Sequence, residues 1–414
     1  MDIAVIGAGA SGIFAALAAS QSGARVTLID HNARIGKKLL VTGSGRCNLS
    51  NSGLSPEAYY CADPDWMSQF LLAFPLASLI QELEGYGIPV HHRQDGWYYP
   101  LSDSAHAVVE ILQNALEIHE VKLLLSTQVT DFEPAGGHFL VHFPSGKLAR
   151  TRSFDKLVLA AGGKAYPTLG SRGELFPSLA RCGHTVVPLL PALGPLELEL
   201  GSFKSLQGQR LDVASAIYAG TECLGQSRGN IIITPWGMNG PGVMNLSHLA
   251  ARYLESQSQN RLRQRLTLTL DLLAYHAEAF SNLLDQRKNS RSSVKAFLEA
   301  FFVPGMAEFF LAKNNISTEI PLRDLPERQL AQLVRGLHNV SFTITNVKGF
   351  EQSQLSAGGV PVTEVDPRTC QSRLIPGLYL VGETLDVVGP CGGFNLHFAF
   401  GSGWLAGRQL ALQP

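Results

Sequence analysis

The sequence predicts an α/β protein whose parallel sheet is assembled from both ends of the chain. A strand, a glycine-rich turn, a helix and a second strand follow one another within residues 2–30. A buried-strand pattern returns at residues 377–383 and leads into another glycine-rich junction. The stretch between them, roughly residues 190–345, has clustered prolines, short β-like runs and then long helical patterns. We therefore expect one α/β domain interrupted by an insertion.

The bulk composition is that of an ordinary globular protein. A length of 414 residues allows two or three domains, and 45% of the residues are hydrophobic and 16% charged. A formal net charge of -1 gives no global attraction for nucleic acid or for an anionic membrane. The six cysteines are scattered without a CxxC pair, so neither a disulfide framework nor a metal site is expected. No uncharged apolar run approaches the about 18 residues of a membrane span, so we expect a cytoplasmic protein without a membrane partner.

The first glycine-rich turn has the spacing of a dinucleotide-binding fingerprint. Gly7, Gly9 and Gly12 form G-x-G-x-x-G directly after the strand "DIAVIG" and open the helix "IFAALAASQSG". Gly7 permits the tight turn, Gly9 lets a pyrophosphate approach the backbone, and Gly12 lets helix and strand pack closely. The helix N-terminus adds free N–H groups and a positive dipole end. Asp30 closes the second strand, "RVTLID", where a carboxylate accepts hydrogen bonds from ribose hydroxyls. These residues predict a Rossmann-type domain.

The identity of the dinucleotide is narrowed by Asp30 and by the second glycine-rich junction. The Asp30 carboxylate would repel the 2′-phosphate of NADP, which leaves FAD and NAD. FAD is long and must be held at both ends, and "VGETLDVVGPCGGFN" (381–395) offers a second strand-to-helix junction. A third candidate for close backbone approach to the ligand is Gly162, at the end of the strand "FDKLVLAAGG". We therefore expect FAD as the cofactor.

Four segments carry a resemblance to a known family. They are "GAGASG", "ARIGKKLLVTGSGRCNLSN", "GWYYPLSDSAHAVVEIL" and "GLYLVGETLDVVGPCGGFNLHFAFGSG". Together they resemble the BaiN-like (YhiN) family of FAD-dependent oxidoreductases, which includes aminoacetone oxidase-like and 3-dehydro-bile-acid reductase-like flavoproteins. The resemblance implies a discontinuous FAD-binding domain at residues 1–190 and 346–414. It also implies an inserted β-rich domain at 191–250 and 321–345 and a small helical domain at 251–320.

The resemblance also implies which residues hold FAD. The ADP half would be bound at the fingerprint and just after the second strand, with adenine contacted by backbone near Val129. The segment from Lys38 to Asn48 would line the flavin and pyrophosphate side, Gly382 and Glu383 would reach the ribityl chain and phosphates, and the "GGFN" helix would point at the isoalloxazine. The cofactor-binding residues expected in this way are Gly7, Gly9, Ala10, Ser11, Gly12, Asp30, His31, Lys38, Thr42, Gly43, Gly45, Arg46, Cys47, Asn48, Val129, Gly162, Gly382, Glu383, Gly392, Gly393, Phe394 and Asn395.

Two residues are candidates for a direct part in catalysis. Cys47 in "GRCN" would be a redox-active thiol, with Cys391 as a second thiol that comes near the flavin. The alternative is a packing role for Cys47, because its loop lacks the second cysteine four residues away that disulfide reductases of this fold have. His397, two positions after "GGFN", is the candidate for proton transfer. A helix beginning at "GGFN" would place partial positive charge near the flavin pyrimidine ring, which favours hydride transfer at N5.

Three functions are compatible with these residues. The leading one is an FAD-dependent oxidoreductase that reduces an activated C=C or oxidises an amine in a small organic substrate. The second is an FAD-containing protein that acts on or with RNA, although the neutral net charge leads us to expect no nucleic-acid partner. The third is a non-catalytic flavin scaffold. No second G-x-G-x-x-G follows a strand, so NAD(P)H is expected only as a transient electron donor, with oxygen as another electron partner. The sequence does not determine the oligomeric state.

Overall fold

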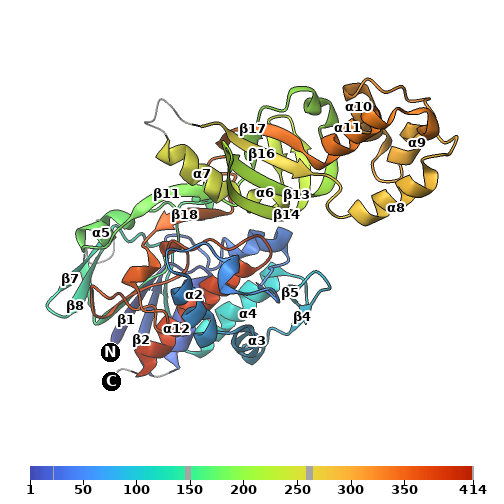
Figure 1. Ribbon diagram of the computed structural model, residues 1–414. Helices are drawn as coiled ribbons and strands as arrows, with labels where there is room; N and C mark the ends of the chain where they lie inside the picture. The colour runs from blue at the N-terminus through green and yellow to red at the C-terminus, as the bar shows by residue number, and fades with distance from the viewer. Residues whose placement is uncertain (22, 145–150, 258–263, 413–414) are drawn as a thin grey trace. The chain divides into compact units, whose positions relative to one another are not determined.

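The computed structural model describes residues 1–21, 23–144, 151–257 and 264–412. The chain forms two compact units. The larger unit contains Met1–Ala192 and Gly349–Pro414, and the smaller one contains Leu193–Lys348. Figure 1 shows the two ends of the chain together in the larger unit, whose ribbon combines the blue and the red segments. Among the described residues, no helix combines the length and the apolar character that crossing a membrane requires.

A parallel sheet lies at the centre of the larger unit. Over the described residues its strand order is β19-β10-β1-β2-β6. Ile6 pairs with both Ile29 and Leu159, and Leu159 pairs with Leu380, so these strands end at the same edge. The prediction of one sheet built from both ends of the chain is therefore confirmed. The strands are β1 (Asp2–Ile6), β2 (Arg25–Ile29), β6 (Lys122–Leu124), β10 (Lys156–Leu159) and β19 (Leu378–Leu380).

Two helices that follow glycine-rich turns pack closely against each other. These are α1 (Ala10–Ser20) and α12 (Phe394–Leu412), drawn in blue and in red in Figure 1. A side chain at Gly403 of α12 would overlap the carbonyl oxygen of Ser11, and one at Gly407 would overlap that of Ala15. The two glycines therefore let the helix backbones touch. This contact joins residues almost 400 positions apart in the chain and brings the two glycine-rich junctions into one unit.

The remaining elements of the larger unit are smaller sheets and helices around this core. Two further three-stranded antiparallel sheets have the strand orders β3-β5-β4 and β7-β8-β9. Strand β11 pairs with β18 in a separate antiparallel ladder. The strands are β3 (Ser50–Asn51), β4 (Val90–His92), β5 (Trp97–Pro100), β7 (Asp131–Ala135), β8 (His138–His142), β9 (Thr151–Phe154), β11 (Val187–Ala192) and β18 (Leu355–Gly359). The helices are α2 (Pro64–Ala73), α3 (Leu76–Gly85), α4 (Ala105–Ile118) and α5 (Phe176–Arg181).

The smaller unit contains a closed barrel, in the strand order β12-β15-β14-β13-β16-β17 over the described residues. Its strands alternate buried and more exposed residues, as a barrel with a packed interior requires. In β16, for example, the three leucines are buried and the threonines between them are not. The strands are β12 (Leu196–Leu198), β13 (Arg210–Ala219), β14 (Glu222–Thr234), β15 (Gly237–Asn239), β16 (Leu266–Asp271) and β17 (Val340–Val347).

The helices of the smaller unit differ in position from the ranges expected from the sequence. Strand β16 lies inside the range 251–320 that we assigned to a helical domain, and α11 lies inside the range 321–345 that we assigned to the β-rich one. The strict alternation in "LTLTLD" has the period of a strand, and β16 forms there because its three leucines face the packed interior of the barrel. The helices are α6 (Pro241–Met244), α7 (Ser247–Ser256), α8 (Ala277–Arg287), α9 (Val294–Leu298), α10 (Pro304–Lys313) and α11 (Glu327–His338).

Candidate functional site

The turn between β1 and α1 leaves open space at one glycine and none at the other two. A Cβ at Gly7 would overlap the carbonyl oxygen of Ala160, and a Cβ at Gly12 would overlap that of Gly7. A Cβ at Gly9 would meet no atom within 4 Å. Gly9 is also the N-cap of α1, and no side chain caps the helix there. The first turn of α1 therefore presents backbone N–H groups, and the positive end of the helix dipole, to a space where an anion fits.

Asp30 lies beside this turn, at the end of β2. Its Oδ2 accepts a hydrogen bond from the N–H of Ala8 at 2.7 Å, and its Oδ1 accepts one from the N–H of Asn32 at 2.7 Å. The Nδ1 of His31 lies 3.6 Å from the same Oδ1. A carboxylate has about four acceptor positions. The two backbone amides thus orient the Asp30 carboxylate and leave acceptor positions for a ligand with hydroxyl groups.

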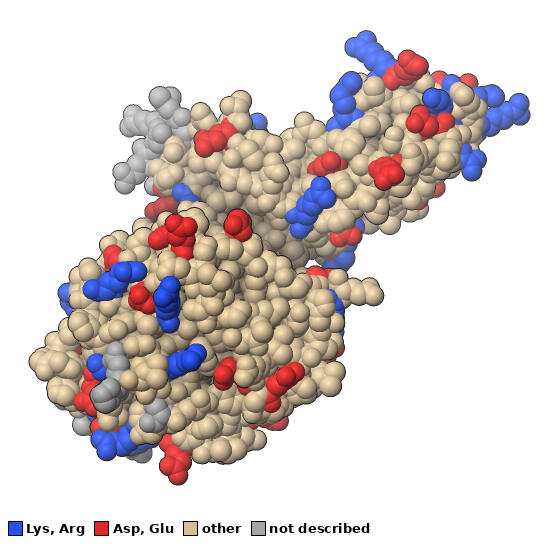
Figure 2. Space-filling model, turned by 60° about the horizontal axis from the view of Figure 1, so that its bottom comes forward, with Lys and Arg blue, Asp and Glu red and all other residues tan. Residues whose placement is uncertain are grey.

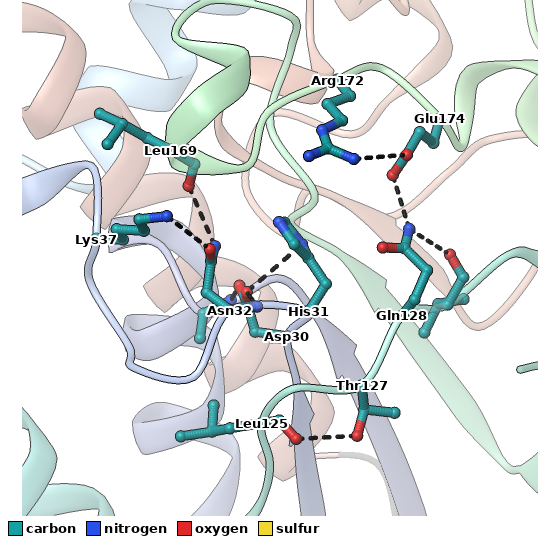
Figure 3. A network of polar contacts seen from close by, with 12 residues as sticks. Asp30, His31, Asn32, Lys37, Leu125, Thr127, Gln128, Leu169, Arg172 and Glu174 are labelled. Carbon is teal, nitrogen blue, oxygen red and sulfur yellow. Dashed lines mark hydrogen bonds and ion pairs between the residues drawn. The ribbon is translucent and has the colours of Figure 1, made fainter. Parts of the chain in front are cut away.

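A network of polar contacts joins the Asp30 region to a segment that follows β10 (Figure 3). The side chain of Asn32 donates to the carbonyl of Leu169 at 3.1 Å, and Lys37 Nζ donates to Asn32 Oδ1 at 3.2 Å. On the other side of Asp30 in Figure 3, Gln128 Nε2 donates to Glu174 at 2.7 Å. These residues were not expected from the sequence, because the contacts of Asn32 with Leu169 and of Gln128 with Glu174 join separate segments and leave no local pattern.

Two segments expected at the flavin end lie against each other. The side chain of Asn51 donates to the carbonyl of Gly392 at 2.9 Å. A Cβ at Gly393 would overlap the carbonyl oxygen of Ser50, and this glycine has a φ of +98°. The amide group of Asn48 lies beside Gly393 and donates to the carbonyls of Tyr98 and Ser50 at 3.2 and 3.1 Å in the orientation its neighbours require. The "GRCN" and "GGFN" segments are therefore parts of one structure in which Gly393 admits no side chain.

Asn395 shapes the loop that precedes α12. Its Oδ1 accepts from the N–H of Gly389 at 2.8 Å, and its Nδ2 donates to the carbonyl of Gly389 at 2.8 Å and to that of Pro390 at 3.3 Å. The amide of Asn395 is therefore occupied in closing its own loop. Its part in a cofactor site would be to position the loop and the N-terminus of α12.

Lys38 and Glu383, both expected to bind the cofactor, form an ion pair. Lys38 Nζ lies 2.7 Å from Glu383 Oε2, and Glu383 Oε1 accepts from the N–H of Ser356 at 2.8 Å. Both side chains are largely shielded from solvent, with exposures of 26% and 12%. The next residue back, Gly382, donates its N–H to Ser402 Oγ of α12 at 2.9 Å. These contacts tie the segment after β2, the segment after β19 and α12 together.

The loop of residues 42–47 has an unusual backbone. Positive φ angles occur at Gly43, Ser44, Gly45 and Cys47, with values of 55°, 58°, 84° and 62°. Two of these residues are not glycine, and left-handed backbone costs a non-glycine residue of order 1 kcal/mol or more. The side chain of Thr42 holds the loop by donating to the carbonyl of Leu39 at 2.7 Å. Such conformations persist where the surrounding structure imposes them, and here Gly43 lies against Asn48 and against Tyr99 of β5.

The structure does not support the catalytic role that we expected for His397. Its side chain is fully buried in α12. Its Nδ1 is hydrogen-bonded to Ser50 Oγ at 3.0 Å, and its Nε2 to the carbonyl of Phe74 at 3.2 Å. Burial lowers the pKa of the imidazole to about 4, so it is neutral near pH 7. Both ring nitrogens are used by the protein, and we correct the assignment: His397 joins α12 to β3 and to the end of α2.

The structure also argues against a reactive thiol at Cys47. Its side chain is fully buried, and desolvation raises the pKa of the thiol to about 12, although a hydrogen bond with Thr42 opposes this. Burial likewise raises the pKa of Cys391 to about 12. The thiolate is the nucleophilic and redox-active form, and neither residue forms it to a useful extent at neutral pH. We therefore correct the catalytic assignment of Cys47 to a packing role in the loop.

The other expected residues lie near these two regions. Val129 lies in the irregular segment after β6 rather than in a strand, and it is buried. Gly162 follows β10 with a φ of +76° and lies against the side chain of Ser171. Tyr99 contacts the "GRCN" loop through Arg46, and Arg93 lies over the same ring; neither residue was among the expected site residues. The aromatic run "WYYP" in β5 was the available signal for Tyr99.

The residues fit a bound FAD. Gly9 and the start of α1 offer an open, anion-binding helix end, and Asp30 keeps free acceptor positions beside it. At the other end, Gly393 lets the start of α12 pack directly on the backbone of Ser50, which fixes the N-terminus of α12 beside the "GRCN" segment. An extended dinucleotide needs donors for its phosphates, acceptors for a ribose and close backbone approach at the ring. The structure provides the first two at Gly9 and Asp30, and the helix N-terminus of α12 lies in the same unit as both.

Comparisons with known proteins agree with this geometry. Residues 1–409 match the family model described as "HI0933-like protein Rossmann domain". The chain is 33% identical to the 3-dehydro-bile acid delta(4,6)-reductase of Clostridium scindens, over 100% of this chain and 99% of that protein. It is 29% identical to the ribosomal RNA dihydrouridine synthase of Escherichia coli, over 99% of this chain and 98% of that protein.

Among solved structures, the fold is similar to that of 3-ketosteroid delta1-dehydrogenase from Sterolibacterium denitrificans, with a TM-score of 0.50 and 12% identity. The match covers 99% of each chain. The fold and the two glycine-rich junctions define the class of protein as an FAD-dependent oxidoreductase. The chain belongs to the HI0933-like Rossmann family, as the resemblance in its motifs indicated.

Proposed function

We propose that the protein reduces a carbon–carbon double bond conjugated to a carbonyl group, with hydride transfer at the flavin N5. The observation that carries this proposal is the 33% identity, over the whole chain, to a reductase whose name specifies delta(4,6) double bonds in a 3-dehydro bile acid. A 3-oxo group next to a double bond makes the distal carbon electrophilic. The structure is compatible with this chemistry because its glycine-rich turns expose backbone N–H groups where the cofactor would lie.

The residues of the chain would bind and orient the cofactor rather than react themselves. A reduced FAD supplies the hydride when it is bound. The Asp30 carboxylate would hold the adenosine half, and the first turn of α1 would neutralise the phosphates. The N-terminus of α12 would stabilise negative charge on the ring, because the helix dipole is positive at Phe394. The buried and occupied His397 leaves the proton for the substrate to a donor other than this imidazole.

The test is an anaerobic spectral titration of the purified yellow protein. We expect NADH or NADPH to bleach the oxidised flavin bands, and a cyclic enone added afterwards to restore them with formation of the saturated ketone. NAD(P)H as electron donor is part of this proposal. Bleaching by primary amines in place of NAD(P)H would favour amine oxidation instead. A flavin that stays oxidised with every reductant would contradict the proposal and favour a scaffold.

A second candidate substrate is a uracil base in RNA. Two relatives, at 29% and 25% identity over 99% of this chain, are ribosomal RNA dihydrouridine synthases. Reduction of uridine to dihydrouridine saturates a double bond conjugated to a carbonyl, so the chemistry proposed above would be the same. Figure 2 shows basic and acidic side chains interspersed over one face, so RNA would be held there by local cations rather than by a broad basic surface.

An RNA assay separates the two candidates. Total RNA from a strain that lacks the protein would be incubated with the holoenzyme and NADPH, and its dihydrouridine content measured by mass spectrometry. An increase over a control without enzyme would favour RNA as the substrate. Reduction of a 3-oxo-4-ene steroid acid without any increase in dihydrouridine would favour a small molecule.

A further inference from the structure

Among the described residues, Arg46 lacks the acidic partner that Lys38 and Arg93 each have. Lys38 is paired with Glu383 at 2.7 Å, and Arg93 is paired with Asp103 at 2.7 Å. Over the described residues, Arg46 forms no ion pair, and its hydrogen bond is from Nε to the carbonyl of Gly43 at 3.2 Å. This bond leaves both terminal nitrogens of the guanidinium for another partner. Arg46 is half-buried, so its charge is not simply dispersed in solvent.

Tyr99 fixes the position of this unpaired guanidinium. The Cζ of Arg46 lies 5.2 Å from the centre of the Tyr99 ring, and the Cζ of Arg93 lies 4.4 Å from it. Tyr99 is 1% exposed, and its ring also packs against Gly43. A cation over a buried aromatic face is held more strongly than one at an exposed face. Arg93 is paired with Asp103, and Asp95 also acts electrostatically on the ring, whereas Arg46 has no described acid within ion-pair distance.

The position of Arg46 in the loop brings this charge to the flavin end of the site. Two residues further along, the Asn48 side chain lies beside Gly393 in the "GGFN" segment. The resemblance places Arg46 among the cofactor-binding residues, but the open turn around Gly9 offers backbone donors suited to the FAD phosphates, which would leave Arg46 for a different anion. An arginine held rigid with two free nitrogens is suited to bidentate binding of a carboxylate or a phosphate.

We infer that Arg46 binds an oxyanion of the substrate and that Tyr99 is the residue that positions it. This inference rests on the proposed reduction of a conjugated double bond and specifies its substrate as anionic. The oxyanion is the carboxylate of a small organic acid or a phosphate of RNA, and both make the same contact with a guanidinium. A protonated amine meets a like charge at this place, so the inference disfavours the amine oxidation considered above.

The experiment compares anionic probes with their neutral counterparts on the FAD-loaded protein. Binding is followed by perturbation of the flavin absorbance and does not require turnover. The first pair is a 3-oxo-4-ene bile acid and its methyl ester, and the second is a uridine-containing RNA hairpin and free uridine. We expect Arg46→Gln to weaken binding of one of the anionic probes by about 30-fold and to change its neutral counterpart by less than about 3-fold. Arg46→Lys restores part of the loss, because a lysine keeps the charge without the bidentate geometry.

Two further variants test the part played by Tyr99. Tyr99→Phe keeps the aromatic face and should bind the anionic probe like the wild type, whereas Tyr99→Leu should lose part of the affinity. Arg25→Gln is the matched control, because Arg25 pairs with Asp2 on the exposed surface. The resemblance assigns Arg46 to the cofactor and this inference assigns it to the substrate, so the FAD dissociation constant of every variant separates the two: the inference expects it to stay within about 3-fold of the wild type.

The outcomes show whether the oxyanion is a carboxylate or a phosphate, and which results would overturn the inference. Loss of affinity for the bile acid supports a carboxylate, and loss of affinity for the hairpin supports a phosphate. An unchanged ratio of anionic to neutral binding in Arg46→Gln would overturn the inference, as would wild-type protein that binds neither anionic probe. Weaker FAD binding with unchanged probe binding would also overturn it, because Arg46 would then serve the cofactor. Enone reduction by the wild type, scored separately, shows whether the proposed function itself holds.

Discussion

Gly9→Ala separates the affinity for FAD from the stability of the fold. The added methyl group would meet no atom within 4 Å, and the φ of −83° and ψ of −172° at Gly9 are accessible to alanine. Gly12→Ala is the contrasting change, because its methyl group would overlap the carbonyl oxygen of Gly7. The two variants therefore differ by one methyl group placed three residues apart, one in open space and one inside the packed turn.

Two opposing effects set the change in the free energy of unfolding of Gly9→Ala in the protein without cofactor. Alanine is a poorer N-cap than glycine, by several tenths of a kcal/mol to about 1 kcal/mol. Replacing glycine also removes freedom from the unfolded chain, which stabilises the fold by about 0.4–1 kcal/mol. We expect the free energy of unfolding of apoprotein Gly9→Ala to lie within about 0.5 kcal/mol of the wild type. Gly12→Ala must shift the backbone and should cost at least about 2 kcal/mol.

The effect on FAD binding should be larger than the effect on stability. If the pyrophosphate touches the Gly9 backbone, the methyl group occupies space that the ligand needs, at a cost of about 1–3 kcal/mol. This corresponds to a rise of about 5- to 150-fold in the dissociation constant. The assay is titration of apoprotein with FAD by quenching of flavin fluorescence, together with urea unfolding of the same preparations. A Gly9→Ala protein of normal stability and normal FAD affinity would refute the assignment of this turn to the pyrophosphate.

Three further predictions concern Asp30, the thiols and His397. Asp30→Ala removes the acceptor beside the turn and should weaken FAD binding about 10- to 100-fold by calorimetric titration, and an unchanged affinity would place the ribose elsewhere. Because burial raises the pKa of both thiols to about 12, the double variant Cys47→Ala, Cys391→Ala should retain turnover within about 3-fold, and a larger loss in steady-state assays would restore thiol chemistry. Burial lowers the pKa of His397 from an ordinary 6.5 to about 4, so between these pH values the unfolded chain binds more protons than the folded one. The free energy of unfolding therefore falls as the pH drops from 6.5 towards 4, by about 3 kcal/mol in total. Urea midpoints at pH 7 and pH 5 should show this slope in the wild type and a flatter one in His397→Gln, and equal slopes in the two proteins would contradict the lowered pKa.

Local patterns in the sequence predicted many of the strands and turns of the larger unit. The turn at Gly7, Gly9 and Gly12 is a contiguous motif, because one strand, one turn and one helix make the whole binding surface for a pyrophosphate. The strand "GLYLVGE" was recognised by its apolar run, and it takes its place in the sheet as β19. Within the insertion, "LTLTLD" carried a strand pattern as clear as these, and it was overlooked because long helical patterns surround it.

The roles of single side chains were predicted less well than the motifs that contain them. His397 directly follows a glycine-rich junction, yet it lies on the side of α12 that packs against Ser50 and Phe74. A helix turns through about 100° per residue, so a neighbouring position in the sequence faces a different part of the structure. Cys47 was expected to be reactive from its motif, but reactivity depends on solvation, which is a property of the packed environment.

The sequence by itself determined the class of fold, the position of the cofactor fingerprint and the family, because each of these is written in short contiguous segments. Only the tertiary structure decided how the distant segments meet. It pairs Lys38 with Glu383, lays Asn51 against Gly392 and places Arg46 over Tyr99, where no described acid forms an ion pair with it. These relations depend on which side chains share space after folding, and a partner several hundred residues away leaves no periodicity or spacing in the chain that would reveal it.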